Sequence, residues 1–337
     1  MKREKKAQTW TLFSFLVLLT YSFAIDARAQ EKLILSYASV GATNAIWNIA
    51  KEAGFYKKRG LDAEVVYIGS TTLSAAAVLS GHVQVGMVAG SGVANAAAGG
   101  ADLVAVACFV NVLDYDLVVQ ASMNSPEDLK GKAIGISRFG SVTDVAARAF
   151  LAELKLRPGE DVTIRQMGGP AERAAAFDRG VIAGFLSSPG SIHLLGKTLP
   201  HKVLLGTANI TNPPPFPWVC AATKKDYVAK KRENVKKLVM SLIEATHYFK
   251  TNKEGTKRVI AKYHPVAHPA YLEDAYDSTV RILERLPYVT RPGMENLLNE
   301  ARKTNPAFKV TVNDLVDDTI IRELEREGFI DLVYGKK

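Results

Sequence analysis

The residues best suited to chemistry gather in short turns rich in serine, threonine and glycine, each directly after a predicted strand. These turns cover residues 39–43, 69–72, 89–92, 137–143, 168–170 and 187–190. Loops at the carboxyl ends of parallel strands meet at one edge of a sheet, where ligands bind. Their hydroxyls, backbone N–H groups and helix N-termini favour an anionic or electron-rich ligand. The alternative for any single turn is that its hydroxyl only caps a helix, as Ser141 with Asp144 fits a capping box.

Arg138 is the one cationic side chain in these turns. A guanidinium can hold a carboxylate, sulfonate or phosphate through two parallel hydrogen bonds. The alternative is an arginine in solvent. Several aromatic residues could form the apolar wall of a binding site, although aromatic side chains near strand ends also serve in protein cores: Tyr37, Trp47, Phe139, Phe216 and Trp218.

Catalytic and metal-binding motifs are weak in this sequence. There is no HExxH, GxSxG or Walker motif, and no GxGxxG follows the first predicted strand. His264 and His268 are four residues apart, but the adjacent prolines interrupt the helix that would align them. Cys108 and Cys220 are too few for a four-thiolate zinc site. We expect two separate buried thiols, with one disulfide as the alternative, and we predict no catalytic residues, no metal and no cofactor.

The N-terminus has the pattern of a secretory signal peptide. Four basic residues lie within the first six, an uncharged apolar run extends to Ile25, and Ala27 and Ala29 provide a cleavage site before Gln30. A retained membrane anchor is the alternative. No lipoprotein cysteine stands at the cleavage site, so we expect a freely diffusing periplasmic protein. Removing residues 1–29 takes five basic and two acidic residues and lowers the net charge from +9 to +6.

The rest of the sequence alternates short apolar runs with segments of helical periodicity. This alternation is typical of parallel sheets with helices on both faces. Predicted strands cover residues 33–38, 63–68, 83–88, 103–110, 115–120, 132–137, 162–167, 183–187, 202–206 and 219–222. Predicted helices cover residues 44–53, 71–79, 93–98, 142–154, 171–177, 192–198, 232–251, 253–263, 269–286, 292–303 and 312–327. Ser125 to Asp128 reads as a capped helix start with proline in its first turn.

The chain is expected to form two lobes with a helical C-terminal region. The prolines between residues 207 and 218 suit a second crossing between lobes, after a first crossing near residue 111. Lobe I would then be discontinuous, built from residues 30–111 and 213–337, and lobe II would comprise residues 112–212. Basic residues gather at 224–237, where they are read as a solvated helix face. Export and the absence of interleaved aromatic residues argue against nucleic acid as a partner.

Three segments resemble one family, the nitrate, taurine and aliphatic-sulfonate type of periplasmic binding proteins, which includes proteins similar to the fungal thiamine-pyrimidine synthase. They are Ile49 to Glu64, Ser80 to Gly86 together with Gly69, and Ser125 to Lys132. The resemblance implies a type II periplasmic-binding-protein fold, an α/β fold of two doubly wound lobes joined by two hinge crossings. It also implies ligand contacts from Ser39, Val40, Gly41, Ser70, Thr71, Gly90, Ser91, Arg138, Phe139 and Ser141.

The same resemblance implies a monomeric substrate-binding component that delivers a small, anionic organic solute to an ABC permease and its ATPase. At Ala38 and Ser39 the sequence lacks the polar amide that sulfonate and taurine binders often carry, so the ligand class stays open. Two alternatives share the fold, a pyrimidine-precursor synthase and a periplasmic ligand sensor. The cysteine-rich iron motif of the synthases is absent from this sequence, which argues against that activity.

Overall fold

Two five-stranded sheets flanked by helices form the part of the chain that the computed structural model describes, residues 32–188, 195, 199–206, 209–210, 214–263 and 268–335. The α/β prediction is therefore confirmed. The predicted signal peptide and all of the predicted helix 192–198 except Leu195 lie outside these residues. No helix in the described ranges is long and apolar enough to cross a bilayer.

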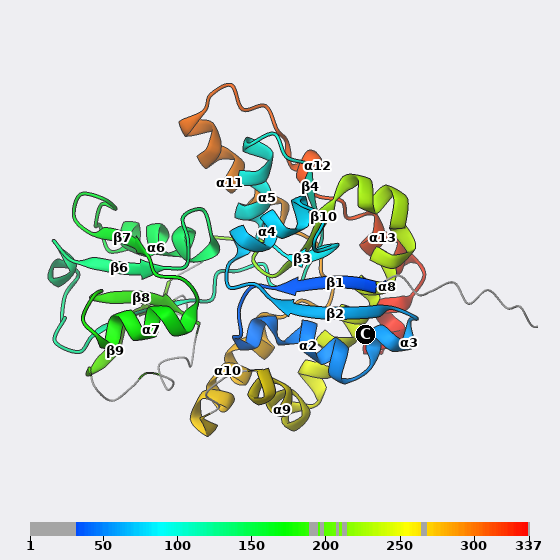
Figure 1. Cartoon of the computed structure of the whole chain (residues 1–337), viewed down its shortest axis with the longest axis horizontal. Coiled ribbons are helices and arrows are strands. Elements are labelled where there is room, and N and C mark those ends of the chain that lie inside the picture. The colour runs from blue at the N-terminus through cyan, green and yellow to red at the C-terminus, as the bar shows by residue number, and fades with distance from the viewer. Residues whose placement is uncertain are drawn as a thin grey trace, which may run out of the picture. The chain divides into compact units, whose positions relative to one another are not determined.

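The first sheet has the strand order β2-β1-β3-β10-β4. Its strands are β1 (Lys32–Tyr37), β2 (Asp62–Tyr67), β3 (Val85–Met87), β4 (Leu103–Cys108) and β10 (Cys220–Lys224). β10 follows much later in the chain but lies between β3 and β4 (Figure 1). It runs antiparallel to both, so the expectation of parallel strands does not hold for β10. The chain leaves β4 and enters β10 at the same end of the sheet, where Trp218 N donates to Val110 O. Because β10 starts where β4 ends, β10 must run in the opposite direction to β4.

Helices cover both faces of the first sheet. Residues alternate along β4, so Val104 and Val106 join one apolar cluster while Leu103 and Ala105 join another. The first cluster includes buried residues of α2 (Ala45–Glu52) and α8 (Lys225–Thr251). The second includes residues of α4 (Thr71–Leu79), α5 (Gly90–Ala98) and α11 (Arg291–Thr304). The helices after β10 gather beside this sheet (Figure 1).

The second sheet has the order β7-β6-β8-β5-β9. Its strands are β5 (Asp116–Gln120), β6 (Ala133–Ile136), β7 (Thr163–Gln166), β8 (Gly184–Ser187) and β9 (His201–Gly206). β6 is parallel to β7 and β8, whereas β5 is antiparallel to β8 and β9. Phe150 of α6 (Val142–Glu153) packs in the cluster that contains Leu117, and Phe177 of α7 (Pro170–Asp178) packs with Val118. These two helices therefore cover opposite faces of the sheet.

The remaining helices are η1 (Ala42–Asn44), α3 (Phe55–Lys58), η2 (Pro126–Leu129), α9 (Lys253–Tyr263), α10 (Pro269–Ile282), α12 (Val312–Leu315), α13 (Thr319–Arg326) and α14 (Phe329–Tyr334). The predicted cap of η2 is confirmed, since Ser125 N donates to the Asp128 carboxylate over 2.9 Å. The predicted single helix 312–327 is wrong. Val316 is extended and bridges to Ala105 of β4, which separates α12 from α13.

Cys108 and Cys220 form a disulfide, so the expectation of two separate thiols is wrong. The two residues are directly opposite each other on the antiparallel strands β4 and β10. Residues paired across neighbouring strands have their Cβ atoms close together, which brings the sulfur atoms within bonding reach. The bridge therefore holds the returning strand to the strand where the first segment of the sheet ended.

Candidate functional site

Turns after the strands of the first sheet present hydroxyls and helix N-termini at one edge. After β1, Ser39 Oγ accepts from Gly41 N over 3.2 Å. After β2, Ser70 caps α4 by accepting from Thr72 N, and both Ser70 and Thr71 are buried. After β3, Ser91 lies in the first turn of α5, and its buried Oγ has no hydrogen-bond partner among the described residues. These turns leave polar groups ready to accept an additional partner.

The turns of the first sheet meet turns of the second sheet. Thr71 Oγ1 accepts from Val142 N, the first residue of α6, over 3.4 Å. Asn95 of α5 donates from Nδ2 to Gly140 O over 3.2 Å. A Cβ atom at Gly41 would lie 3.2 Å from Ser188 Oγ, just after β8. The strand-terminal turns of the two sheets therefore face one another within contact distance.

The turn after β6 holds a compact hydroxyl cluster. Ser137 Oγ lies 2.8 Å from Ser141 Oγ and 2.9 Å from Thr143 Oγ1, and all three side chains are buried. The predicted capping box of Ser141 with Asp144 is wrong. The Asp144 carboxylate accepts from Gly140 N instead, because the Ser141 hydroxyl is engaged within this cluster.

The other predicted ligand contacts differ in how far they are exposed to solvent. Arg138 is exposed, and Phe139 is 49% exposed. Val40 is half-buried beside Gly41. Gly90 is packed against the second crossing, because its N–H donates to Pro217 O over 2.7 Å and a Cβ atom there would lie 2.3 Å from Pro217 Cγ. The space beside Gly90 is thus filled by Pro217 of the protein itself, whereas Arg138 and Phe139 are exposed to solvent.

Arg173 is a residue that the sequence patterns did not single out. It lies in the first half of α7, is only 4% exposed, and donates from Nη1 to Gly168 O over 2.8 Å. Its Nε has no partner among the described residues. Burial lowers the pKa of this guanidinium, an effect opposed by Tyr115, Tyr67 and Glu172. The available signal was a cation near the N-terminus of a helix, where the helix dipole disfavours positive charge.

Aromatic side chains surround this arginine from both crossings and from the first sheet. Tyr67 ends β2, and its hydroxyl would lie 3.0 Å from a Cβ atom at Gly169, which caps α7. The ring of Tyr67 lies 5.5 Å from that of Tyr37, and the ring of Tyr115 lies 4.9 Å from that of Trp218. Trp47 and Phe216 are core residues, 0% and 4% exposed. Among the aromatic residues in this group, Tyr67 is 44% exposed and therefore accessible.

A model of the family described as NMT1/THI5 like matches residues 44–255, well over half of the chain. The chain belongs to this family. The resemblance inferred from the sequence is therefore confirmed. The matched range includes the turns after β2, β3, β6, β7 and β8, whereas Ser39, Val40 and Gly41 lie just before it.

Relatives of this NMT1/THI5 like chain are distant in sequence. A Brucella abortus protein named "Putative binding protein BAB2_1146" is 25% identical over 85% of this chain and 88% of its own length. The periplasmic aliphatic sulphonate binding protein SsuA of Escherichia coli is 18% identical, with a TM-score of 0.66 over 87% of this chain and 99% of its own. The periplasmic nitrate-binding protein NrtA of Synechocystis PCC 6803 is 15% identical, with a TM-score of 0.71 over 88% of each chain. The fold is that of periplasmic binding proteins.

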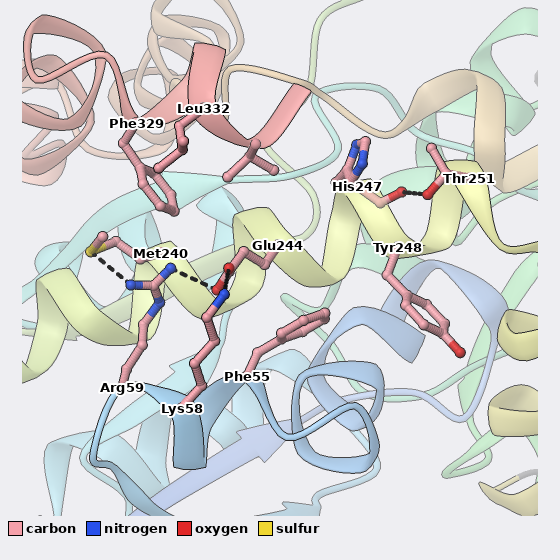
Figure 2. A pocket seen from close by; sticks show the side chains of 11 residues that line it. Phe55, Lys58, Arg59, Met240, Glu244, His247, Tyr248, Thr251, Phe329 and Leu332 are labelled. Carbon is pink, nitrogen blue, oxygen red and sulfur yellow. Dashed lines mark hydrogen bonds and ion pairs between the residues drawn. The ribbon is translucent and has the colours of Figure 1, made fainter. Parts of the chain in front are cut away.

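The NMT1/THI5 like chain also has a surface pocket of about 590 Å³ away from the strand-terminal turns, between α3, α8 and α14. Figure 2 shows Lys58 and Arg59 reaching Glu244, at 2.7 and 2.6 Å, with Phe329 and Leu332 above them. Its two cations share a carboxylate, and the Arg59 guanidinium lies 4.9 Å from the Phe329 ring centre. The Glu244 carboxylate thus offsets one of the two positive charges in this pocket. No group of three or more metal-ligating side chains occurs in the described parts of the chain.

Proposed function

We propose that this protein is the substrate-binding component of an ABC importer and captures a small, anionic organic solute between two lobes. Lobe I would comprise residues 30–111 and 213–337, and lobe II residues 112–212. The observation that carries the proposal is the meeting of Thr71 with Val142, which brings the strand-terminal turns of both sheets to one place. A solute held there would contact both lobes at once and would stabilise their closed arrangement.

The anionic character of the solute is supported by the helix starts at these turns. α4, α5, α6 and α7 each begin directly after a strand-terminal turn, and the first backbone N–H groups of a helix carry partial positive charge. The sulphonate and nitrate binders that share this fold bind anions according to their names. The ten predicted contacts, from Ser39 to Ser141, remain our proposal for the surface that the solute touches.

We further propose that residues 1–29 are removed on export, that the mature protein is a periplasmic monomer, and that an ABC permease with its ATPase receives the solute. Selective docking requires the permease to distinguish the closed form from the open one. Ligand must therefore bind the closed form more tightly, since equal affinity would leave the populations unchanged.

The proposal is tested by thermal unfolding of the mature protein, residues 30–337, with carboxylates, sulfonates, nitrate, amino acids and pyrimidines. A ligand at 100 times its Kd adds about 2.7 kcal/mol to the free energy of unfolding. For a protein of this size we expect an increase in Tm of roughly 4 °C. Stabilisation by an organic anion supports the proposal. Stabilisation only by neutral or cationic compounds contradicts the anionic class, and turnover of a bound pyrimidine would favour the enzyme alternative.

A further inference from the structure

We infer that Arg173 provides the positive charge that binds the anionic group of the solute, and that the solute carries this group on a flat aromatic body which lies against Tyr67. This inference rests on the proposed function and names both the chemical class of the solute and the residue that selects it. Arg173, rather than the exposed Arg138 in the turn after β6, would then be the main positively charged contact of the solute.

The first support is the burial of a charge that forms no ion pair with any residue the structure describes. Arg173 is 4% exposed, and in the described part of the chain no carboxylate forms an ion pair with it. Glu172 acts on it only through space. An arginine remains protonated at any physiological pH, and a buried charge costs several kcal/mol unless an opposite charge compensates it. A bound anion would supply that compensation.

The second support is the geometry of the guanidinium. Its Nη1 donates to Gly168 O over 2.8 Å, and its Nε has no partner in the described ranges of the chain. Nε and Nη2 form the edge of the group that binds carboxylates and sulfonates side-on through two hydrogen bonds. The interaction with Gly168 orients the group while leaving a donor on this edge for an oxyanion.

Arg59 provides a comparison within the molecule, because it is a shielded arginine that forms an ion pair with a carboxylate. Its side chain is also largely buried, and its Nε likewise has no partner among the described residues. The difference is the carboxylate: Arg59 Nη2 lies 2.6 Å from Glu244 Oε2, and the same carboxylate binds Lys58 (Figure 2). The protein supplies the counter-charge in that pocket. At Arg173 it supplies a carbonyl oxygen, two tyrosines and the exposed Glu172 carboxylate, which acts through space and forms no ion pair with the guanidinium.

The aromatic part of the inference follows from the groups around Arg173. Tyr67 and Tyr115 both act electrostatically on the guanidinium, Tyr67 lies against the start of α7, and Tyr37 lies beside Tyr67. Tyr67 exposes 44% of its surface although it stands among these buried rings. An exposed ring beside an uncompensated cation suits a planar ligand that stacks on the ring and directs its carboxylate or sulfonate to the arginine.

The experiment is isothermal titration of the mature protein with benzoate, benzenesulfonate, methanesulfonate and the neutral benzamide. We expect the unchanged protein to bind an aromatic anion and to bind benzamide at least 100-fold more weakly. Arg173→Gln should weaken binding of the aromatic anion at least 100-fold. Arg179→Gln, at the exposed C-terminal end of the same helix α7, is the matched control and should change the Kd less than threefold. Tyr67→Ala should weaken benzoate binding more than methanesulfonate binding, and Tyr67→Phe, which keeps the ring, should bind nearly as well as the original.

The Tm measured without ligand distinguishes a structural role of Arg173 from a role in binding. A charge kept for binding destabilises the empty protein, so Arg173→Gln should leave this Tm unchanged or raise it. A lowered Tm together with unchanged affinity would overturn the inference. An aromatic anion bound equally well by the original and Arg173→Gln would overturn it while the proposed function stands. If no organic anion binds the unchanged protein at millimolar concentration, the proposed function itself fails.

Discussion

At Gly90 the start of α5 packs so closely against Pro217 that one added methyl group would disturb the contact. Its Cα faces the ring of Pro217, and an added Cβ atom would lie 2.3 Å from Cγ of a side chain that has no alternative rotamer of different direction. The Gly90 N–H also donates to Pro217 O, so the two segments cannot separate without breaking that bond.

We predict that Gly90→Ala lowers the free energy of unfolding by about 2–3 kcal/mol, because overpacking against a rigid ring forces the backbone to shift. Urea unfolding followed by circular dichroism measures this loss. Gly99→Ala at the end of the same helix is the control. Its nearest atoms would be 3.4 Å away at an ordinary φ of −83°, so it should change stability by less than 0.5 kcal/mol, roughly the scale of surface substitutions. Equal effects of the two substitutions would contradict this account.

Two carboxylates at the start of β5 make stability depend on pH. Burial raises the pKa of Asp116 to about 6, and burial together with Asp116 raises that of Asp114 to about 6, while Arg281 opposes the second shift. Both values exceed the ordinary pKa of about 3.9 expected in the unfolded chain. The folded state therefore binds more protons between pH 4 and pH 6, and its stability falls as the pH rises through this window.

We predict that Asp116→Asn raises the free energy of unfolding at pH 7.5 by about 1–2 kcal/mol and changes it little at pH 4. The effect depends on pH because burial of the Asp116 carboxylate lowers the stability of the folded protein only when the carboxylate is ionised, which occurs above its pKa in the folded state. Unfolding curves at four pH values between 4 and 7.5 measure it. Asp62→Asn, at an exposed carboxylate at the start of β2, should leave the pH profile unchanged. A profile for Asp116→Asn that parallels the original would refute the assignment.

At the scale of elements, alternation and helical periodicity predicted all ten strands and most of the helices that the structure describes, but not α3 or α14. α4 and α9 occupy the predicted residues, and β6, β7 and β8 begin and end within one residue of the prediction. Strand direction was missed, because a short apolar run does not encode which neighbour it pairs with or which way it runs. The disulfide was missed for the same reason, since it depends on Cys220 lying opposite Cys108.

The turns of the site were found because Ser, Thr and Gly recur after successive strands, a local signal. Arg173 was not found, because its burial is a property of the tertiary structure, and Tyr67 and Tyr115, which act on its charge, are distant in sequence. A local pattern shows which residues could bind a ligand. Only tertiary structure shows which charge lacks a partner.

The bridge between β4 and β10 spans 112 residues of sequence. Constraining so long a loop reduces the entropy of the unfolded chain. We predict that Cys108→Ser with Cys220→Ser lowers the free energy of unfolding by about 2–4 kcal/mol. Thermal unfolding measures the loss, and the original protein unfolded in dithiothreitol should show a similar decrease. Free-thiol titration of the denatured, unreduced protein should find no reactive thiol; two reactive thiols would contradict the bridge.

At the scale of the whole molecule, the turns of the two sheets are joined by few polar contacts. Asn95 on α5 reaches Gly140 before α6 through one hydrogen bond of 3.2 Å, exposed to solvent. Such a bond contributes about 1 kcal/mol net. It stabilises the arrangement in which the turns meet and contributes nothing when they are apart.

We predict that Asn95→Ala weakens ligand binding about fivefold, because the closed form loses this bond and becomes less populated. Stability without ligand should change by less than 0.5 kcal/mol, as for other surface substitutions. Titration with the best ligand from the thermal screen measures the affinity. Asn299→Ala, on the exposed surface of α11, is the control and should leave the Kd unchanged. An unaltered Kd in Asn95→Ala would show that this contact is not part of closure.

The position of β10 between β3 and β4 also determines the order in which a nascent chain can complete its sheets. A chain of 206 residues contains all five strands of the second sheet, whereas the first sheet lacks β10, its fourth strand in spatial order, until residue 224. Until then the inner edges of β3 and β4 have no neighbour to pair with, and β4 is one of the most apolar segments of the chain. Unpaired apolar edges invite association with other chains. A chain that ends before residue 220 therefore leaves the apolar edge of β4 unpaired, whereas a longer chain covers that edge with β10.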